Sequence, residues 1–171
     1  MNTKLTLTLI GISLLACNFL FPPPQRLAPE SADFQDPQPT GFTIVRLHPK
    51  DGDLQTMLAS KAQEATALGQ IPVVEFDATW CPPCQAIDKA IKANNDLMLS
   101  AYRDTYIIKL DVDEWGWGDS RKHDFQFEGI PVYFKLDPEG KQTGEVIDGG
   151  AWGEDIPENI APVMDAFFHG E

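Results

Sequence analysis

The spacing of apolar residues over positions 42–171 predicts alternating strands and helices. A compact, β-branched run at residues 71–76 is typical of a central buried strand, and residues 43–47 are a shorter strand candidate. Residues 53–68 indicate a helix, because apolar side chains recur at steps of three and four: Leu54, Met57, Leu58, Ala62, Ala65 and Leu68. Gly69 stands just past the end of this helix.

The rest of this region continues the alternation. The expected elements are a helix opening at 81–84 and ending at the Asn94-Asn95 break, a short helix 96–103, a strand 106–112, strands 131–136 and 143–147, and a helix 154–168. The last two strands form a hairpin around Asp137-Pro-Glu-Gly140, which suits a type I turn. The order βαβαβαββα implies an α/β fold of parallel strands joined by crossover helices, with an antiparallel pair at the end.

The first residues differ from this pattern. Residues 1–16 contain one cation, Lys4, followed by an uncharged run, which indicates a secretory signal. Leu14-Leu15-Ala16-Cys17 resembles the lipobox of bacterial lipoproteins, which implies a lipidated Cys17 at the mature N-terminus. An uncleaved anchor over residues 5–21, about 25 Å long as a helix, and plain cleavage without lipidation are the alternatives. All three place residues 42–171 outside the cytoplasm.

Residues 17–41 are expected to form a linker after the lipidated cysteine. The segment 22–41 carries six prolines among polar residues and has no apolar periodicity. Extended polyproline geometry at about 3.1 Å per residue would hold a domain roughly 60 Å from its anchor. The expected organisation is therefore a signal peptide (1–16), a lipidated linker (17–41) and one domain (42–171).

Composition excludes some functions. The 13 Lys and Arg against 26 Asp and Glu give a net charge of -13, which argues against nucleic-acid binding. Three cysteines are too few for a disulfide-stapled scaffold or a four-thiolate zinc site. The acidic stretch from Asp137 onward is expected to be a solvated surface.

The strongest signal is Trp80-Cys81-Pro82-Pro83-Cys84, directly after the buried strand. A CxxC at a strand-to-helix turn of an exported α/β domain favours redox chemistry. Cysteines at i and i+3 of a first helical turn lie about 5 to 6 Å apart, which a disulfide accepts. The helix dipole stabilises a thiolate at Cys81, so we expect Cys81 to be the exposed nucleophile and Cys84 to resolve the mixed disulfide. Prolines in the first turn lose no helical hydrogen bond.

These residues resemble the thioredoxin family. Residues 74–84 are similar to that family's strand, Trp-Cys-x-x-Cys and helix, and Gly129-Ile-Pro-Val132 is similar to its cis-proline loop. The resemblance covers residues 71–148 and, we expect, all of 42–171. It implies a thioredoxin fold with three α/β/α layers around a mixed sheet of about five strands. It also implies a cis Pro131 against the disulfide and an Ile130 whose backbone pairs with the substrate; Gly-Ile-Pro alone would favour a trans proline at an edge strand.

The same resemblance assigns roles to two charged residues near the cysteines, and a third charged residue departs from the family. Glu75 stands where thioredoxins carry a buried acid, and Lys109 where many carry a nearby lysine. A buried carboxyl with a raised pKa is suited to accept the Cys84 proton through a water; the alternative is a structural ion pair. Asp77 departs from the family. If Asp77 lies on the same strand face as Glu75, its negative charge would raise the pKa values of the thiols and make the domain reducing. The alternative is that Asp77 is solvated at the end of the strand.

Substrate contacts are assigned to residues at the carboxyl edge of the sheet, where α/β folds place ligand sites. The loop 114–118 would supply one groove wall through a tryptophan, the alternative being that both of its tryptophans cap the core. The assigned residues are Trp80, Pro82, Pro83, Ile130, Trp115 and Trp117.

Metal and cofactor chemistry are not expected. A CxxC with a histidine resembles the copper site of some membrane-tethered assembly proteins, but those have a wider cysteine spacing, and His123 lies in a charged run typical of a solvated helix face. His48 and His169 are the other histidines. We therefore expect no metal and no cofactor beyond the Cys81–Cys84 disulfide.

The resulting hypothesis is a lipid-anchored oxidoreductase in the periplasm or at the cell surface, which reduces protein disulfides as a monomer and draws electrons from a membrane donor. The reducing direction follows from the absence of a histidine between the cysteines. The alternative is a non-catalytic adaptor or assembly module, including copper delivery or cytochrome maturation. The interval between Cys84 and Pro131 leaves no room for the large insertion of cytochrome-maturation reductases, although their motif is similar.

Overall fold

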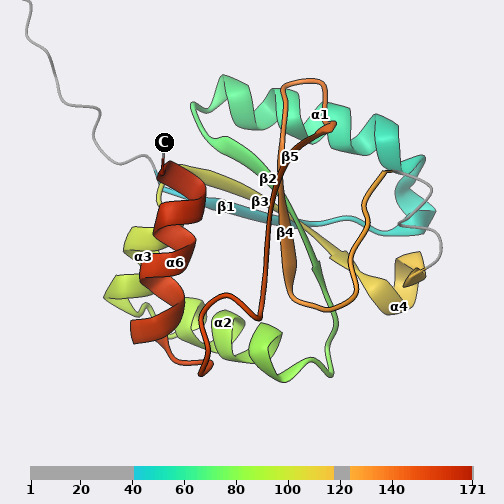
Figure 1. The fold of residues 1–171 in the computed structure, drawn as a ribbon. Coiled ribbons are helices and arrows are strands. Elements are labelled where there is room, and N and C mark those ends of the chain that lie inside the picture. The colour runs from blue at the N-terminus through green and yellow to red at the C-terminus, as the bar shows by residue number, and fades with distance from the viewer. Residues whose placement is uncertain (1–40, 118–123, 171) are drawn as a thin grey trace, which may run out of the picture. The chain divides into compact units, whose positions relative to one another are not determined.

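The described part of the chain folds into a five-stranded mixed sheet with helices on both faces (Figure 1). The computed structural model describes residues 41–117 and 124–170. The strands are β1 (Thr43–Arg46), β2 (Ile71–Asp77), β3 (Thr105–Asp111), β4 (Val132–Leu136) and β5 (Gln142–Asp148). The helices are η1 (Pro49–Asp51), α1 (Leu54–Ala67), α2 (Pro82–Lys92), α3 (Asp96–Tyr102), α4 (Val112–Trp115) and α6 (Pro157–His169).

The strand order β1-β3-β2-β4-β5 places β2 at the centre of the sheet, as its apolar run predicts. The three strands β1, β3 and β2 are parallel. β4 runs antiparallel to β2 and pairs with β5 in the expected hairpin. The predicted α/β class and the antiparallel pair at the end of the chain are confirmed.

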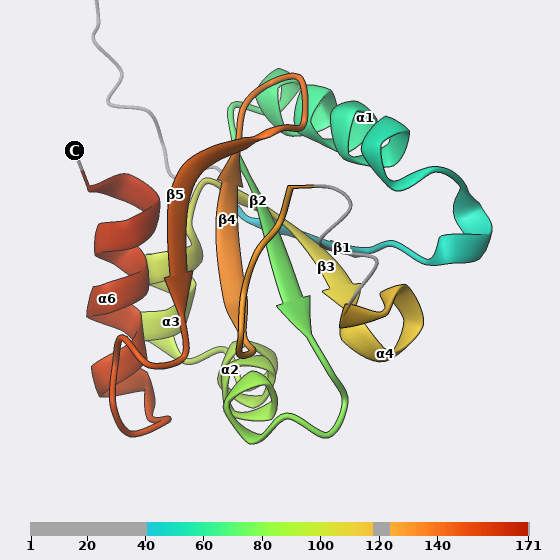
Figure 2. The same cartoon turned by 45° about the vertical axis from the view of Figure 1, so that its right-hand side comes forward.

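Helices cover the two faces of the sheet unequally. One face packs on α1, where Leu54 and Leu58 join Val74 and Phe76 of β2 in one core cluster. The other face packs on α2, α3 and α6, which lie on the opposite side of the sheet from α1 (Figure 2). Because side chains alternate along a strand, the residues of β2 that flank Val74 point to this second face. The alternation therefore directs Glu75 toward α2 and α3.

Most predicted boundaries hold within one or two residues. Asp53 caps α1 by accepting a hydrogen bond from the Thr56 amide (2.9 Å), and Gly69, at φ 68°, follows the helix end. The hairpin turn closes through the Gly140 amide, which donates to the Asp137 carbonyl (2.9 Å).

Two boundaries differ from the expectation. α6 begins at Pro157 rather than at 154, since proline fits the first helical position. The expected loop after β3 begins as the short helix α4, which Asp111 caps by accepting from the Asp113 amide (2.8 Å).

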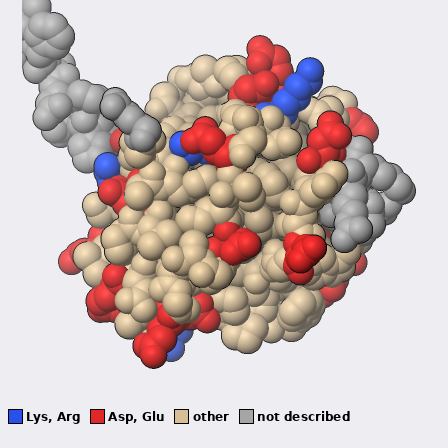
Figure 3. All heavy atoms as spheres, in the orientation of Figure 1, with Lys and Arg blue, Asp and Glu red and all other residues tan. Residues whose placement is uncertain are grey.

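The segments 1–16 and 17–41 were assigned to a signal peptide and a linker. Cys17 and all but the last residue of these segments lie outside the described residues. No helix within residues 41–117 and 124–170 is long and apolar enough to span a membrane. Acidic side chains form separate groups over the face shown in Figure 3, in keeping with a solvated acidic surface.

Candidate active site

Cys81 and Cys84 form a disulfide at the start of α2. Their Cα atoms are 5.3 Å apart, inside the range expected from the helical spacing. Cys81 is the N-cap, and its Sγ accepts a hydrogen bond from the Cys84 amide (3.3 Å), while Pro82 and Pro83 fill the first turn. The pairing and the position at the helix N-terminus are confirmed. The expected exposure of Cys81 is not: in the oxidised state it is 1% exposed, because it packs in the core cluster beside Cys84.

The loop before β4 contains the predicted cis bond. The Ile130–Pro131 peptide is cis, and Pro131 is buried. The Pro131 carbonyl accepts a hydrogen bond from the Gly149 amide (2.9 Å), so this loop is attached to the end of β5. Ile130 packs against the core cluster that contains both cysteines. The structure thus brings the proline loop and the disulfide into one region, as the resemblance implies.

Glu75 is a buried acid at the middle of β2. Its neighbour in the register is Lys109 on β3 and, on the other side, Tyr133 on β4. The carboxylate is 1% exposed, and its Oε1 lies 3.2 Å from Lys109 Nζ. Burial raises the pKa of Glu75 from 4.5 to about 7, and the Lys109 charge opposes this shift only in part. Both interpretations offered for Glu75 therefore have a basis, an ion pair and a titrating acid.

Lys109 is shared between three carboxylates. Its Nζ lies 3.2 Å from Glu75, 3.0 Å from Asp77 and 2.6 Å from Asp88 on α2. Burial lowers the pKa of Lys109, but the attraction of Glu75 and Asp77 outweighs it and the net shift is upward. The ammonium group therefore remains charged. Its single positive charge does not fully neutralise the three carboxylates around it.

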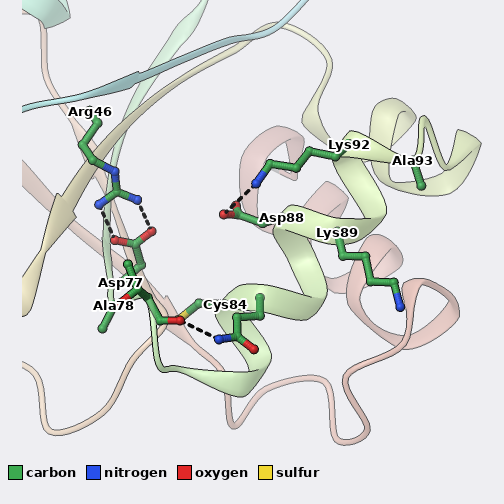
Figure 4. Close-up of a pocket in the computed structure, with 10 residues that line it drawn as sticks. Arg46, Asp77, Ala78, Cys84, Asp88, Lys89, Lys92 and Ala93 are labelled. Atoms are coloured by element: carbon green, nitrogen blue, oxygen red, sulfur yellow. Dashed lines mark hydrogen bonds and ion pairs between the residues drawn. The ribbon is translucent and has the colours of Figure 1, made fainter.

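Asp77 is buried and paired, which corrects the interpretation that it is solvated at the strand end. It is 3% exposed, and Arg46 of β1 donates to both of its oxygens, at 2.8 and 2.6 Å (Figure 4). Lys109 adds a second cation at 3.0 Å. Two cations therefore partly offset the negative charge of Asp77.

The tryptophans occupy two different environments. Trp80 is 55% exposed, and its indole donates a hydrogen bond to Asp113 Oδ2 (2.7 Å). Trp117 is 37% exposed, and its ring lies 5.5 Å from that of Phe127. Trp115, in contrast, is buried and donates to the Leu47 carbonyl (3.0 Å). The prediction that Trp115 lines a groove is wrong, because the short helix α4 turns this side chain into the core.

A cavity of about 590 Å³ lies beside Cys84, on the side of α2 that faces β1. Arg46 and Asp77 form one wall, and Asp88 with Lys92 lies across from them (Figure 4). Cys84 and the buried Asp77 therefore line the same cavity.

His48 and His169, the two histidines among the described residues, have partners other than the cysteines. His48 Nδ1 lies 2.5 Å from Glu114 Oε2, and His169 Nε2 lies 3.3 Å from the Ala101 carbonyl. His123 lies outside the described residues. Among residues 41–117 and 124–170, no group of three or more His, Cys, Asp or Glu side chains is arranged to hold a metal ion.

Sequence reasoning missed three residues of the site. Arg46 follows an apolar run and carries no motif, and only the pairing of β1 with β3 brings it to Asp77. Asp88 stands one helical turn after Cys84, a spacing that signals a shared helix face. Asp113 accepts a hydrogen bond from the Trp80 indole, and no local sequence pattern indicates this contact.

A redox cysteine pair at a helix N-terminus, next to a cis-proline loop and a buried acid, defines a thioredoxin-like thiol–disulfide oxidoreductase site. The family model described as Thioredoxin matches residues 55–161, and the chain belongs to that family. The predicted thioredoxin fold is confirmed.

Relatives of this chain include free thioredoxins and domains of larger proteins. It is 33% identical to "Thioredoxin H4" of Arabidopsis thaliana over 110 residues, which cover 63% of this chain and 81% of the relative. It is 32% identical to "Thioredoxin-like protein HCF164, chloroplastic" of Oryza sativa over 90 residues, 52% of this chain and 32% of the relative. It is 33% identical to "Thiol:disulfide interchange protein DsbD 2" of Pseudomonas aeruginosa over 94 residues, 50% of this chain and 16% of the relative.

The matched region thus spans a third or less of the two larger relatives. Among solved structures, the disulphide isomerase of Xylella fastidiosa aligns with a TM-score of 0.48 at 20% identity, over 66% of this chain and 89% of that one.

Proposed function

We propose that this protein is a membrane-tethered, extracytoplasmic oxidoreductase that reduces protein disulfides. The observation that carries the proposal is the Cys81–Cys84 disulfide at the first turn of α2, where the Cys84 amide donates to Cys81 Sγ and the helix dipole favours a thiolate. The family membership and the cis bond before Pro131 support it.

The reaction begins with the reduced pair. The Cys81 thiolate attacks one sulfur of a substrate disulfide and forms a mixed disulfide. The other substrate sulfur leaves as a thiolate and takes up a proton. The substrate backbone is held beside Ile130, ahead of the cis bond, and Trp80, Pro82, Pro83 and Trp117 are the proposed further contacts.

The second step regenerates the enzyme disulfide. Cys84 loses its proton and attacks the Cys81 sulfur, so the Cys81–Cys84 bond forms while the bond to the substrate breaks. Two electrons have then passed from the dithiol to the substrate. Glu75, with its pKa of about 7, is the proposed acceptor of the Cys84 proton through a water. The cavity beside Cys84 has room for a water next to this residue, and Glu75 is not among the residues that line it.

The reducing direction is inferred from the two residues between the cysteines, Pro82 and Pro83, neither of which is a histidine. Equilibration with glutathione or dithiothreitol measures the potential. A reduction potential above about -180 mV would contradict the proposed reducing role.

The proposed location rests on the apolar segment before Cys17 and on the proline-rich residues that follow. Mass spectrometry of the mature protein from its host tests it, with a lipid-modified Cys17 at the N-terminus as the expected result. The Cys17→Ala variant should no longer fractionate with membranes. An unprocessed N-terminus in the cytoplasmic fraction would refute the location.

Trapping separates catalysis from the alternative of an adaptor or assembly module. Cys84→Ser should accumulate mixed disulfides with substrate proteins through Cys81, because the second step is blocked. Cys81→Ser is the matched control and should trap nothing. The absence of adducts in both variants, with both folded, would favour the adaptor.

A further inference from the structure

We propose that Arg46 and Asp77 form a positioning pair that sets the protonation of Glu75 by dividing the charge of Lys109 between two buried carboxylates. The consequence for catalysis rests on the proposed proton-accepting role of Glu75. The charge coupling itself is measured without turnover.

The pair lies at the carboxyl ends of the central strands. Asp77 ends β2, two residues after Glu75, and Arg46 ends β1 on the far side of β3. The side chain of Arg46 crosses the end of β3 to reach Asp77, where it makes two hydrogen bonds of 2.8 and 2.6 Å. Arg46 is also 4.0 Å from Asp111. Figure 4 shows the guanidinium and the Asp77 carboxylate face to face on one wall of the cavity.

Lys109 connects this pair to Glu75. Its Nζ is 3.0 Å from Asp77 Oδ2 and 3.2 Å from Glu75 Oε1. Glu75 Oε1 is buried without a hydrogen-bond partner of good geometry, and Lys109 is the cation nearest to it. Since both oxygens lie so near one nitrogen, they are at most about 6 Å apart, a separation at which two buried charges interact strongly.

Every element around Glu75 contributes a charged or titratable group. β3 provides Lys109 and Asp111, β2 provides Asp77, α2 provides Asp88, β1 provides Arg46, and β4 and α3 provide Tyr133 and Tyr102. Burial and the charge of Glu75 raise the pKa of both tyrosines, so these remain neutral. Asp77 and Asp88 oppose the ionisation of Glu75, and Lys109 favours it.

The two members of the pair should act on Glu75 in opposite directions. Without the Asp77 charge, Glu75 keeps the attraction of Lys109 and loses the repulsion of Asp77, so the pKa of Glu75 falls. Without Arg46, Asp77 is neutralised only by Lys109, and its remaining charge raises the pKa of Glu75 further. A pair that only held the fold together would behave differently, since loosening either end admits water and lowers a pKa that burial has raised.

The experiment is a ¹³C NMR titration of the Glu75 carboxyl in the oxidised protein. We expect Asp77→Asn to lower its pKa and Arg46→Gln to raise it, each by about one pH unit, the size expected for one partly neutralised charge at this distance. Arg46→Lys, which keeps the charge, should restore most of the wild-type value. In the Asp77→Asn background, Arg46→Gln should shift the pKa by less than half as much, because Arg46 acts mainly through Asp77 and attracts Glu75 directly only to a smaller extent.

Shifts in the same direction for the two single variants, or no shift in Arg46→Gln, overturn the proposal. Arg46 is 32% exposed on an edge strand, so its variants are expected to fold and test the proposal even where Asp77→Asn does not. Single-turnover measurements of mixed-disulfide resolution then give the pH profile of the Cys84 step. If the pKa of Glu75 moves while this profile stays fixed, the pair is supported and the proton-accepting role of Glu75 fails.

Discussion

Replacing Glu75 by glutamine should stabilise the folded protein at alkaline pH. The wild-type carboxyl has a pKa of about 7 when folded against 4.5 for an ordinary glutamate. Between these two values the folded protein holds a proton that the unfolded chain has lost, so stability falls as the pH rises through this window. Above pH 7 the wild type bears the full cost of a buried charge, whereas glutamine, which resembles the protonated acid, does not.

The magnitude follows from the width of that window. Each unit of pKa difference corresponds to about 1.4 kcal/mol, so Glu75→Gln should raise the free energy of unfolding by up to about 3 kcal/mol at pH 8. The gain should vanish near pH 4.5. Urea unfolding of the oxidised protein at pH 5 and pH 8 measures both limits. Glu128→Gln is the control, because this carboxylate is exposed, and it should change little at either pH.

A gain of the same size at pH 5 and pH 8, or a loss at pH 8, would refute the reasoning. The first result would mean that Glu75 does not titrate between these values. The second would mean that the ion pair with Lys109, 3.2 Å away, stabilises the fold by more than burial of the charge costs.

Three further outcomes are expected. Lys109→Met should cost about 3 to 5 kcal/mol in urea unfolding at pH 7, because three carboxylates within 3.2 Å lose their cation; the cost should shrink as they protonate at low pH, and a pH-independent cost would contradict this. Gly140→Ala should cost about 3 kcal/mol, measured by thermal unfolding, since its Cβ would lie 2.4 Å from the Ala59 nitrogen at φ 78°; an unchanged Tm would contradict it. Asp113→Ala should change stability by less than about 1 kcal/mol but raise KM for a protein disulfide about twofold to fivefold, because Trp80 loses its fixed position; an unchanged KM would exclude this role.

Local patterns were sufficient to predict the elements and the reactive pair. The period of Leu54, Leu58 and their neighbours determines α1, and the run 71–76 lies in the central strand because only a doubly covered strand is apolar on both faces. The disulfide geometry follows from the first turn of a helix, which is a local property. The cis bond before Pro131 required the resemblance, since the tripeptide alone does not specify it.

Long-range contacts were not predictable in the same way. The environment of Asp77 depends on which strand lies two places away in the sheet, and the sequence position of Arg46 contains no information about that order. The prediction for Trp115 is wrong because the residue lies in a four-residue helix, which turns its side chain into the core. A loop, as predicted from the sequence, does not specify the direction of the side chain. Burial of Cys81 likewise arises from packing by distant segments.

The place of Arg46 on an edge strand also affects local unfolding. β1 contains only four residues and is hydrogen-bonded to β3 alone, so by itself it would open readily. Its departure would leave the Asp77 carboxylate, 3% exposed, without its closest cation, and this penalty adds to the few hydrogen bonds that β1 loses. Amide hydrogen exchange in β1 should therefore be slowed by the Asp77 side chain of β2, a strand that is not its neighbour in the sheet, and the edge of the sheet should open together with this charge network.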